Sequence, residues 1–306
     1  MLYLEREPFR RAQYTILENG RELEKRLFAY YFMDGPANIV VEEIAGYQNV
    51  DGGFGNAIEP DFRLPASSPM ATSVALQHLV HFDDLPLAKG VISKAIAYLD
   101  NTYVSERKGW FAVPRTVNDY PHAPWWGCDE EKEICAIDAN WGNPTAEIIG
   151  YLTRYREFTN LDVDELISQA TRYLESMNTF TSFHEILCFV RLYRLLDEKT
   201  AASLRPKLYE AVCTLISKDE EEWRTEYVAK PLDFVTSPEE FFCVDRELIE
   251  KNIEYYINEL HTHGKIKPTW SKSFYDGEMS RAWDEWVAII TLRVLLILKS
   301  FGRILL

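Results

Sequence analysis

The chain alternates between two kinds of hydrophobic pattern. Apolar residues recur at helical spacing and predict amphipathic helices over residues 37–45, 87–103, 162–177, 200–217 and 245–260. Residues 70–80, 143–158, 183–196 and 283–301 are apolar on most sides, and a helix of that kind is surrounded by other elements. Residues 9–32 also have a helical pattern, with a break predicted at Asn19 and Gly20. No stretch predicts a β-strand, so we expect an all-α fold of paired outer and inner helices.

Three irregular stretches, residues 108–142, 222–242 and 261–279, interrupt these helices. The longest of them, residues 108–142, is rich in aromatic residues and contains four tryptophans, Trp110, Trp125, Trp126 and Trp141. A loop of this length is uncommon unless it lines or covers a site. Two interpretations stay open: the stretch forms part of a cavity wall, or it is a packed structural insert.

A glycine-rich turn precedes the first largely apolar helix. Residues 51–55 read Asp-Gly-Gly-Phe-Gly, and glycine permits positive φ angles and a close approach of two backbones. Ser67 and Ser68 are followed by Pro69, an order of residues that indicates a helix N-terminus. Gln48 can bond exposed backbone groups near this turn. The stretch from residue 47 to 69 therefore predicts a turn that leads into the helix over residues 70–80.

This stretch resembles the repeat of the prenyltransferase β-subunit and squalene cyclase superfamily, which reads roughly Gln-x-x-Asp-Gly-Gly-Phe-Gly. The matching residues are Gln48, Asp51, Gly52, Gly53, Phe54 and Gly55. The resemblance covers about residues 37–82, and residues 141–158, 183–196 and 283–301 show a weaker similarity to the repeat. It implies one α/α toroid domain over residues 1–306, either a closed or an incomplete ring, in which the motif ties an outer helix to an inner one. An open α-solenoid is the alternative fold.

In such toroids the cavity lies at the centre of the ring, where the inner helices begin. The resemblance therefore implies that Asp61, Glu59 and Asp284 are the candidate catalytic acids. The candidate substrate-binding residues are Trp125, Trp126, Asp138, Trp141, His184, Glu185, Tyr275, Trp283 and Glu285. Glu147 also lies at the start of an inner helix. Acidic residues at helix N-termini also serve as caps and dipole partners, and this alternative stays open for each carboxyl group.

The known activities of the superfamily depend on motifs that this chain lacks. Squalene cyclase relatives carry their acid in an Asp-x-Asp-Asp motif, and the nearest string here, residues 162–165, opens an amphipathic helix. The Asp, Cys and His residues that hold zinc in protein prenyltransferases have no recognisable counterpart. Asp83 and Asp84 do not begin an Asp-Asp-x-x-Asp metal motif, because Leu-Pro-Leu-Ala follows them. The sequence therefore predicts no metal site and no cofactor.

Three classes of function remain. The leading interpretation is a toroid that binds an isoprenoid-like or other apolar ligand, with terpenoid-cyclase- or prenyltransferase-like acid chemistry in an aromatic-lined cavity. Aromatic faces stabilise carbocations, and a carboxylic acid supplies the proton. The second interpretation is a glycoside hydrolase or lyase with paired carboxylates and indole platforms. The third is a binding protein without catalysis. The expected partner is a small apolar or sugar-like molecule.

Composition limits the partners and the compartment. A net charge of −15 argues against nucleic acid or an anionic membrane as the main partner. The N-terminus lacks a signal-peptide pattern, and the longest apolar run, residues 287–298, is too short to span a bilayer. The five cysteines include no CxxC pair and suggest neither a disulfide scaffold nor a zinc ribbon. We therefore expect a cytoplasmic protein without a membrane span.

Overall fold

The protein is all-α in the part that the computed structural model describes, residues 1–129, 131 and 134–306. Thirteen α-helices, several 3₁₀-helices and one two-stranded sheet occur within these residues. The chain divides into two compact units, and each is described by itself. Unit 1 consists of Met1–Val40 and Val212–Leu306, and unit 2 consists of Val41–Ala211. The ring of helix pairs within a single domain stays a prediction.

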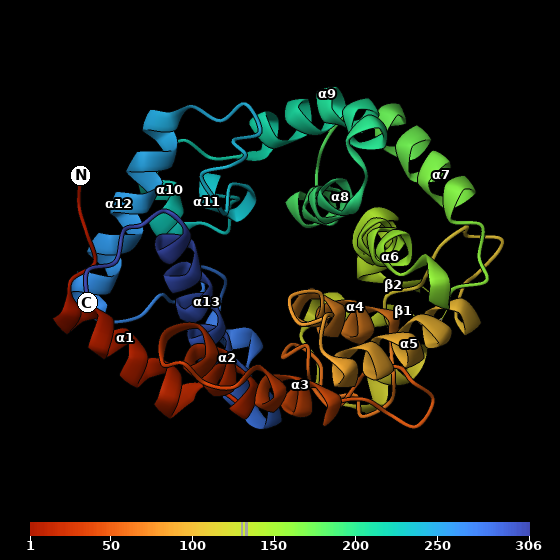
Figure 1. The fold of residues 1–306 in the computed structure, drawn as a ribbon, viewed down its shortest axis with the longest axis horizontal. Helices are drawn as coiled ribbons and strands as arrows, with labels where there is room; N and C mark the ends of the chain where they lie inside the picture. Colours follow the sequence, from red (N-terminus) through yellow and green to blue (C-terminus); the bar gives the residue numbers. More distant parts are fainter. Residues whose placement is uncertain (130, 132–133) are drawn as a thin grey trace. The chain divides into compact units, whose positions relative to one another are not determined.

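The helices of unit 2 follow the predicted alternation of amphipathic and largely apolar segments. In chain order they are α4 (Pro69–Leu79), α5 (Pro86–Asn101), α6 (Gly142–Arg154), α7 (Val163–Ser176) and α8 (Phe183–Leu195). The helices α3 (Ala37–Ala45) and α9 (Glu198–Leu215) each contain residues of both units. In Figure 1, α6 and α8 lie side by side, and α4 and α7 pack against α6.

The burial of α6 and α7 explains why one is apolar all round and the other is amphipathic. Every residue of α6 from Gly142 to Leu152 is buried, whereas α7 buries a single stripe of apolar side chains. A Cβ atom at Gly150 would lie 3.1 Å from the Cα atom of Leu192. The glycine therefore permits the close packing of α6 on α8.

The glycine-rich turn is fastened to the two helices that follow it. The Gln48 side-chain amide donates hydrogen bonds to the carbonyls of Gly52 and Val91, both at 2.9 Å, and Val91 belongs to α5. The Asp51 carboxylate accepts a hydrogen bond from the backbone N–H of Gly53 at 3.0 Å and one from the Ser67 hydroxyl at 2.7 Å. These contacts give the motif a structural role in unit 2.

The predicted start of α4 is confirmed. The Ser68 side chain accepts a hydrogen bond from the backbone N–H of Ala71 at 3.1 Å, and Pro69 occupies the first turn of the helix. On the other side of the turn, the backbone N–H of Phe54 donates to the Thr72 hydroxyl at 3.0 Å. A hydrogen bond thus joins the glycine-rich turn to the N-terminal part of α4, which is itself capped by Ser68.

The long irregular stretch of unit 2 contains short elements that its sequence pattern does not indicate. They are η1 (Arg115–Asp119), η2 (Pro124–Trp126), β1 (Cys128–Asp129), β2 (Ile134–Cys135) and η3 (Ala136–Ala139). The strands β1 and β2 form the antiparallel sheet, and two residues per strand are too few to produce a readable alternation. The backbone N–H of Arg63 donates to the carbonyl of Pro121 at 2.8 Å, which ties this stretch to the segment before α4.

Unit 1 begins with α1 (Arg6–Asn19) and α2 (Glu22–Phe32) and ends with α13 (Ser280–Ser300). Its other helices are α10 (Glu220–Thr225), α11 (Pro231–Phe234), α12 (Arg246–His263), η5 (Lys272–Phe274) and η6 (Gly277–Met279). The helix α1 packs against α2, α12 and α13. The break predicted at Asn19 and Gly20 is confirmed. The predicted end of α12 at residue 260 is three residues short, because the helix continues to a left-handed cap at Gly264.

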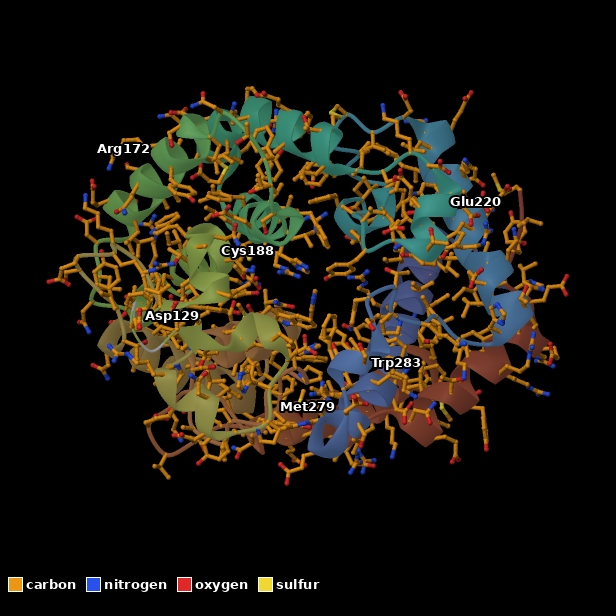
Figure 2. All side chains as sticks on the ribbon, turned by 180° about the vertical axis from the view of Figure 1, so that it is seen from behind. Asp129, Arg172, Cys188, Glu220, Met279 and Trp283 are labelled. Atoms are coloured by element: carbon orange, nitrogen blue, oxygen red, sulfur yellow. A yellow bond between two sulfur atoms is a disulfide. The ribbon has the colours of Figure 1, made fainter. Side chains whose placement is uncertain are left out.

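The cysteines correct one expectation from the sequence. The structure pairs Cys128 with Cys135 and Cys213 with Cys243, while Cys188 is free and buried on α8 (Figure 2). The sheet register places Cys128 directly opposite Cys135, a relation that no CxxC spacing signals. None of the described helices combines the length and the apolar character needed to cross a membrane.

Candidate functional site

Glu59 and Asp61 lie in a strained segment directly after the glycine-rich turn. Asn56 and Ala57, which precede them, have left-handed φ angles of 55° and 62°. Asparagine tolerates this region, but alanine adopts it only where the surrounding structure enforces it, and such strain is concentrated at functional sites. Both carboxyl groups are buried. The segment therefore holds two buried acids in one fixed turn.

The structure brings Trp125 to these acids. The indole N–H of Trp125 donates to the Asp61 carboxylate at 3.0 Å, and the backbone N–H of Asp61 lies 3.3 Å from the Glu59 carboxylate. Trp126 is buried and packs edge-to-face on Phe62, with ring centroids 5.0 Å apart. Trp125 thus belongs to the candidate site, and Trp126 belongs to the core beneath it.

Asp138 organises the end of the long irregular stretch. Its carboxylate accepts hydrogen bonds from the backbone N–H groups of Ala112 at 2.8 Å and Cys135 at 3.3 Å. The Arg107 guanidinium donates to the backbone carbonyl of Asp138 at 2.8 Å and lies 3.9 Å from its carboxylate. Burial raises the pKa of Asp138, while these hydrogen bonds and the charge of Arg107 oppose the rise. Asp138 therefore positions the loop that carries Trp141.

A second carboxyl group, Glu185, lies among aromatic rings at the start of α8. Its Oε1 atom accepts hydrogen bonds from the backbone N–H of Gly142 at 2.7 Å and from the Tyr173 hydroxyl at 3.1 Å. The ring of Tyr173 lies 4.6 Å from that of Trp141 and stacks, 6.2 Å away, on that of Phe189. The Glu185 side chain thus joins α8 to the start of α6 and to α7.

Arg107 connects the two carboxyl groups. Its backbone carbonyl accepts the indole N–H of Trp141 at 3.1 Å, and its positive charge acts on both Asp138 and Glu185. We call Arg107, Asp138, Trp141, Tyr173 and Glu185 the Arg107 cluster. Sequence reasoning missed Arg107 and Tyr173. The sequence feature that could have indicated Arg107 is its position directly before the aromatic stretch over residues 108–142.

The electrostatics of the Arg107 cluster favour protonated side chains. Burial raises the pKa of Glu185, although the hydrogen bonds from Gly142 and Tyr173 and the charge of Arg107 act in the opposite direction. Burial, followed by the proximity of Glu185, raises the pKa of Tyr173 to about 12. Tyr173 is therefore a hydrogen-bond donor at neutral pH, and Glu185 holds its proton to a higher pH than an exposed carboxyl group does.

We expect Glu185→Gln to remove a pH dependence of stability. A carboxyl group whose pKa is higher in the folded than in the unfolded protein binds more protons when folded, so stability falls as pH rises from about 4.5 through the folded pKa. The glutamine keeps an oxygen for Gly142 and Tyr173 but does not titrate. Urea unfolding of both proteins between about pH 4 and 8 measures the difference. A wild-type curve parallel to that of the variant would contradict the prediction.

The other predicted residues lie at separate places. His184 is exposed, and its ring stacks on Phe183 with centroids 4.1 Å apart. In unit 1, Tyr275 is buried, its hydroxyl accepts the Trp270 indole N–H at 2.7 Å, and its ring lies 5.9 Å from that of Trp283. The structure therefore brings Tyr275 and Trp283 together within unit 1.

The two acids of α13 differ in their surroundings. Glu285 is buried and lies 3.6 Å from the guanidinium of Arg281, whereas Asp284 is exposed. An acid in contact with solvent lacks the apolar setting that the sequence-based hypothesis requires of a proton donor. Asp284 is therefore the weakest of the three predicted catalytic residues.

A buried ionic group also lies between α6 and α8. The Glu147 carboxylate accepts hydrogen bonds from the Tyr151 hydroxyl at 2.6 Å and from the Arg191 guanidinium at 2.8 Å, and the Cys188 thiol lies 3.7 Å away. Burial raises the pKa of Cys188 well above its ordinary value, and the Glu147 carboxylate raises it further. Cys188 is thus an unreactive thiol at neutral pH, and the group joins the two helices.

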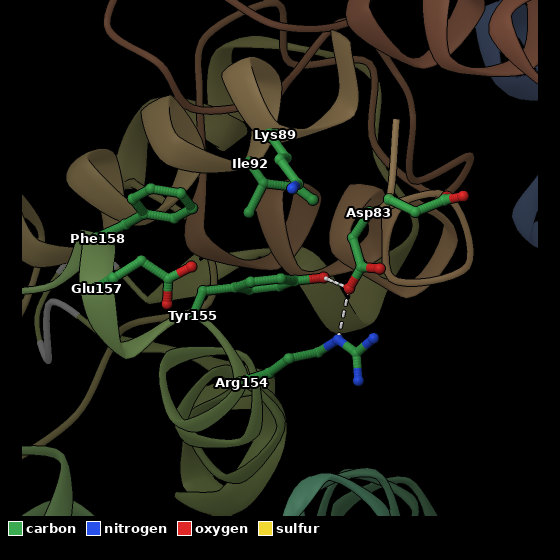
Figure 3. Close-up of a pocket in the computed structure, with 8 residues that line it drawn as sticks. Asp83, Lys89, Ile92, Arg154, Tyr155, Glu157 and Phe158 are labelled. Carbon is green, nitrogen blue, oxygen red and sulfur yellow. Dashed lines mark hydrogen bonds and ion pairs between the residues drawn. The ribbon is translucent and has the colours of Figure 1, made fainter. Parts of the chain in front are cut away.

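Unit 2 contains a cavity of about 630 Å³ that the sequence did not indicate (Figure 3). It lies at the turn between α4 and α5 and at the end of α6. Its lining residues are Asp83, Asp84, Lys89, Ile92, Arg154, Tyr155, Glu157 and Phe158. The signal in the sequence is the Asp83-Asp84 pair, which lacks the third aspartate of an Asp-Asp-x-x-Asp motif.

Comparisons with protein-family profiles, with curated proteins and with solved structures returned no match to this chain. Across residues 1–129, 131 and 134–306, no three His, Cys, Asp or Glu side chains form a group that could hold a metal ion. The functional argument therefore depends on the geometry of the sites described above.

Proposed function

We propose that this protein is a terpenoid-cyclase- or prenyltransferase-like α/α toroid that binds an isoprenoid-like or other apolar ligand and acts on it by acid chemistry at the Arg107 cluster. The observation that carries the proposal is the Glu185 carboxyl group, which is buried beside Trp141 and Tyr173 and has a raised pKa. The resemblance of the glycine-rich turn to the superfamily repeat supports the same assignment.

Each part of the cluster has a chemical role in this proposal. Glu185 donates its proton to an oxygen or a double bond of the ligand, a step favoured when the pKa of the acid lies near the working pH. The Gly142 N–H and the Tyr173 hydroxyl then stabilise the carboxylate that remains. The ring of Trp141, held against Tyr173, stabilises the positive charge that develops on the ligand. Arg107 and Asp138 position the indole.

The proposed acid differs from the three predicted from the sequence. The Asp61 carboxylate already accepts the Trp125 indole N–H, and Asp284 is exposed. The contact between Asp61 and Trp125 favours a second candidate function, a carbohydrate-active enzyme. In that case Trp125 is a sugar platform held in place by Asp61, and Glu59 is the neighbouring carboxyl group.

A thermal-shift screen with product analysis tests the proposal. The ligands are prenyl diphosphates, neutral polyprenes and oligosaccharides, with and without Mg²⁺ and Zn²⁺. An isoprenoid present at 100 times its dissociation constant is expected to add about 2.7 kcal/mol of stability. Glu185→Gln is expected to bind this ligand and to lose about 10²- to 10⁴-fold in turnover.

The matched control is Glu175→Gln, which removes the charge of an exposed glutamate on α7 and should change neither binding nor turnover. A shift with oligosaccharides alone would overturn the isoprenoid assignment and favour the carbohydrate-active enzyme. Isoprenoid binding without any product, in the wild-type protein, would overturn the acid chemistry and identify a binding protein.

A further inference from the structure

The floor of the cavity at the turn between α4 and α5 is formed by a hydrogen-bonded ion pair. The Asp83 carboxylate accepts hydrogen bonds from the Arg154 Nε–H at 2.6 Å and from the Tyr155 hydroxyl at 2.9 Å (Figure 3). Burial alone would raise the pKa of Asp83, but these bonds and the charges of Arg154 and Lys89 outweigh it and lower the pKa. Burial and the hydrogen bond with Asp83 raise the pKa of Tyr155. The floor therefore keeps one ionisation state across the neutral pH range.

The walls of the cavity carry charged groups of both signs that keep hydrogen-bonding capacity for a ligand. The Arg154 guanidinium uses only its Nε–H for Asp83, and its two terminal nitrogens point away from that carboxylate (Figure 3). Within the described part of the chain, the ammonium group of Lys89 and the carboxylate of Glu157 form no hydrogen bond or ion pair. Arg154, Lys89 and Glu157 can therefore each contact a ligand.

Apolar surface lies between these charges. The ring of Tyr155 crosses the view in Figure 3, with the Glu157 carboxylate near one end and the Asp83–Arg154 pair at the other. Ile92 and the ring of Phe158 complete the apolar part of the lining. A pocket of this size accommodates a small molecule with an apolar body and a charge at each end.

We propose that this cavity binds a small zwitterion of the class of a free α-amino acid with an apolar side chain. The ligand carboxylate contacts Lys89 and the terminal nitrogens of Arg154, the ligand ammonium contacts Glu157, and the side chain packs on Tyr155, Ile92 and Phe158. A simple anion would be repelled by the carboxylates of Glu157 and Asp84, and a simple cation would be repelled by Lys89 and Arg154. Only a ligand with both charges satisfies both sets of groups.

Isothermal titration calorimetry of the full chain with leucine and phenylalanine tests this inference, using two blocked forms as probes. The amide of each amino acid lacks the carboxylate, and the N-acetyl form lacks the ammonium group. We expect each blocked form to bind about tenfold more weakly than the free amino acid, because one charge-assisted contact is lost. Equal affinity of free and blocked forms would overturn the proposal.

Two variants assign the ends of the ligand. Lys89→Met is expected to weaken binding of the free amino acid about tenfold and to leave binding of the amide unchanged. Glu157→Gln is expected to weaken the free amino acid and the amide but not the N-acetyl form. Both positions are exposed, so the variants retain the fold. The controls are Lys94→Met on α5 and Glu175→Gln on α7, which lie outside the cavity.

Two further outcomes of these titrations would overturn the proposal. No binding of either amino acid up to about 10 mM would overturn the proposal, since that limit corresponds to an affinity too weak for three charged contacts. Loss of affinity in both variants for every form of the ligand would also overturn it, because neither charge would then be assigned to one end. The inference is independent of the Arg107 cluster, whose residues do not line this cavity.

Discussion

Gly55→Ala is expected to lower the free energy of unfolding by about 3 kcal/mol or more, the largest effect that we predict for a single methyl group. A Cβ atom at this position would overlap the carbonyl oxygens of Pro65 and Ala66 and would lie 2.8 Å from the carbonyl carbon of Ala66. These are backbone atoms, which cannot rotate away as a side chain does. The backbone N–H of Gly55 is also bonded to the carbonyl of Tyr47, so the turn cannot simply move.

Chemical unfolding of the purified variant measures this effect, and Gly90→Ala provides the matched control. Gly90 lies in α5, and nothing lies within 4 Å of the position of its Cβ atom. Alanine is the better helix former by about 1 kcal/mol, so this control should be slightly more stable than the wild-type protein. If Gly55→Ala were as stable as the wild-type protein, the proposed role of the motif in holding the turn against α4 would be wrong.

Arg191→Met is expected to destabilise the protein by about 3 kcal/mol, because it leaves the Glu147 carboxylate buried without its counter-charge. The Glu147 side chain is 2% exposed, whereas that of Arg191 is 35% exposed. The cost of burying charge therefore falls mainly on Glu147. Methionine retains much of the apolar stem of arginine, so the variant tests the charge and not the packing.

Arg172→Met is the control for this second prediction. Arg172 pairs with Glu165 at 2.8 Å on the surface of α7, where both side chains are about 60% exposed. Exposed pairs of this kind contribute at most about 1 kcal/mol, so the control should unfold close to the wild-type denaturant concentration. Similar losses in Arg172→Met and Arg191→Met would show that the ion pair between α6 and α8 has no special importance.

The candidate site was only partly accessible from the sequence. The sequence predicts Asp61, Glu59 and Trp125 as site residues because they flank predicted helices or belong to the aromatic stretch, and the structure places them together. The same features predict Glu185 and Trp141, but nothing in the sequence indicates that Tyr173 connects them. Tyr173 lies on the amphipathic helix α7, and a half-buried tyrosine on such a helix does not indicate a functional site.

The cavity that we assign to a zwitterion was missed for a related reason. Asp83 and Arg154 are separated by 71 residues, and their ion pair is a product of packing between the α4–α5 turn and the end of α6. The pairing of the cysteines was missed as well. Sequence separations of 7 and 30 residues carry no signal, because only the packing of the chain brings the sulfur atoms together.

The sequence by itself determined the local features of this protein. Hydrophobic periodicity, proline, and the serine at the start of α4 act within a few residues along the chain, so the all-α class, most helix boundaries and the glycine-rich turn could be predicted from it. The tertiary structure alone decided which side chains meet. The raised pKa of Glu185, the anchoring of Arg154 by Asp83 and the burial of Glu147 all arise from packing between elements distant in sequence. Burial and charge proximity depend on three-dimensional distance, and no local pattern in the sequence encodes that distance.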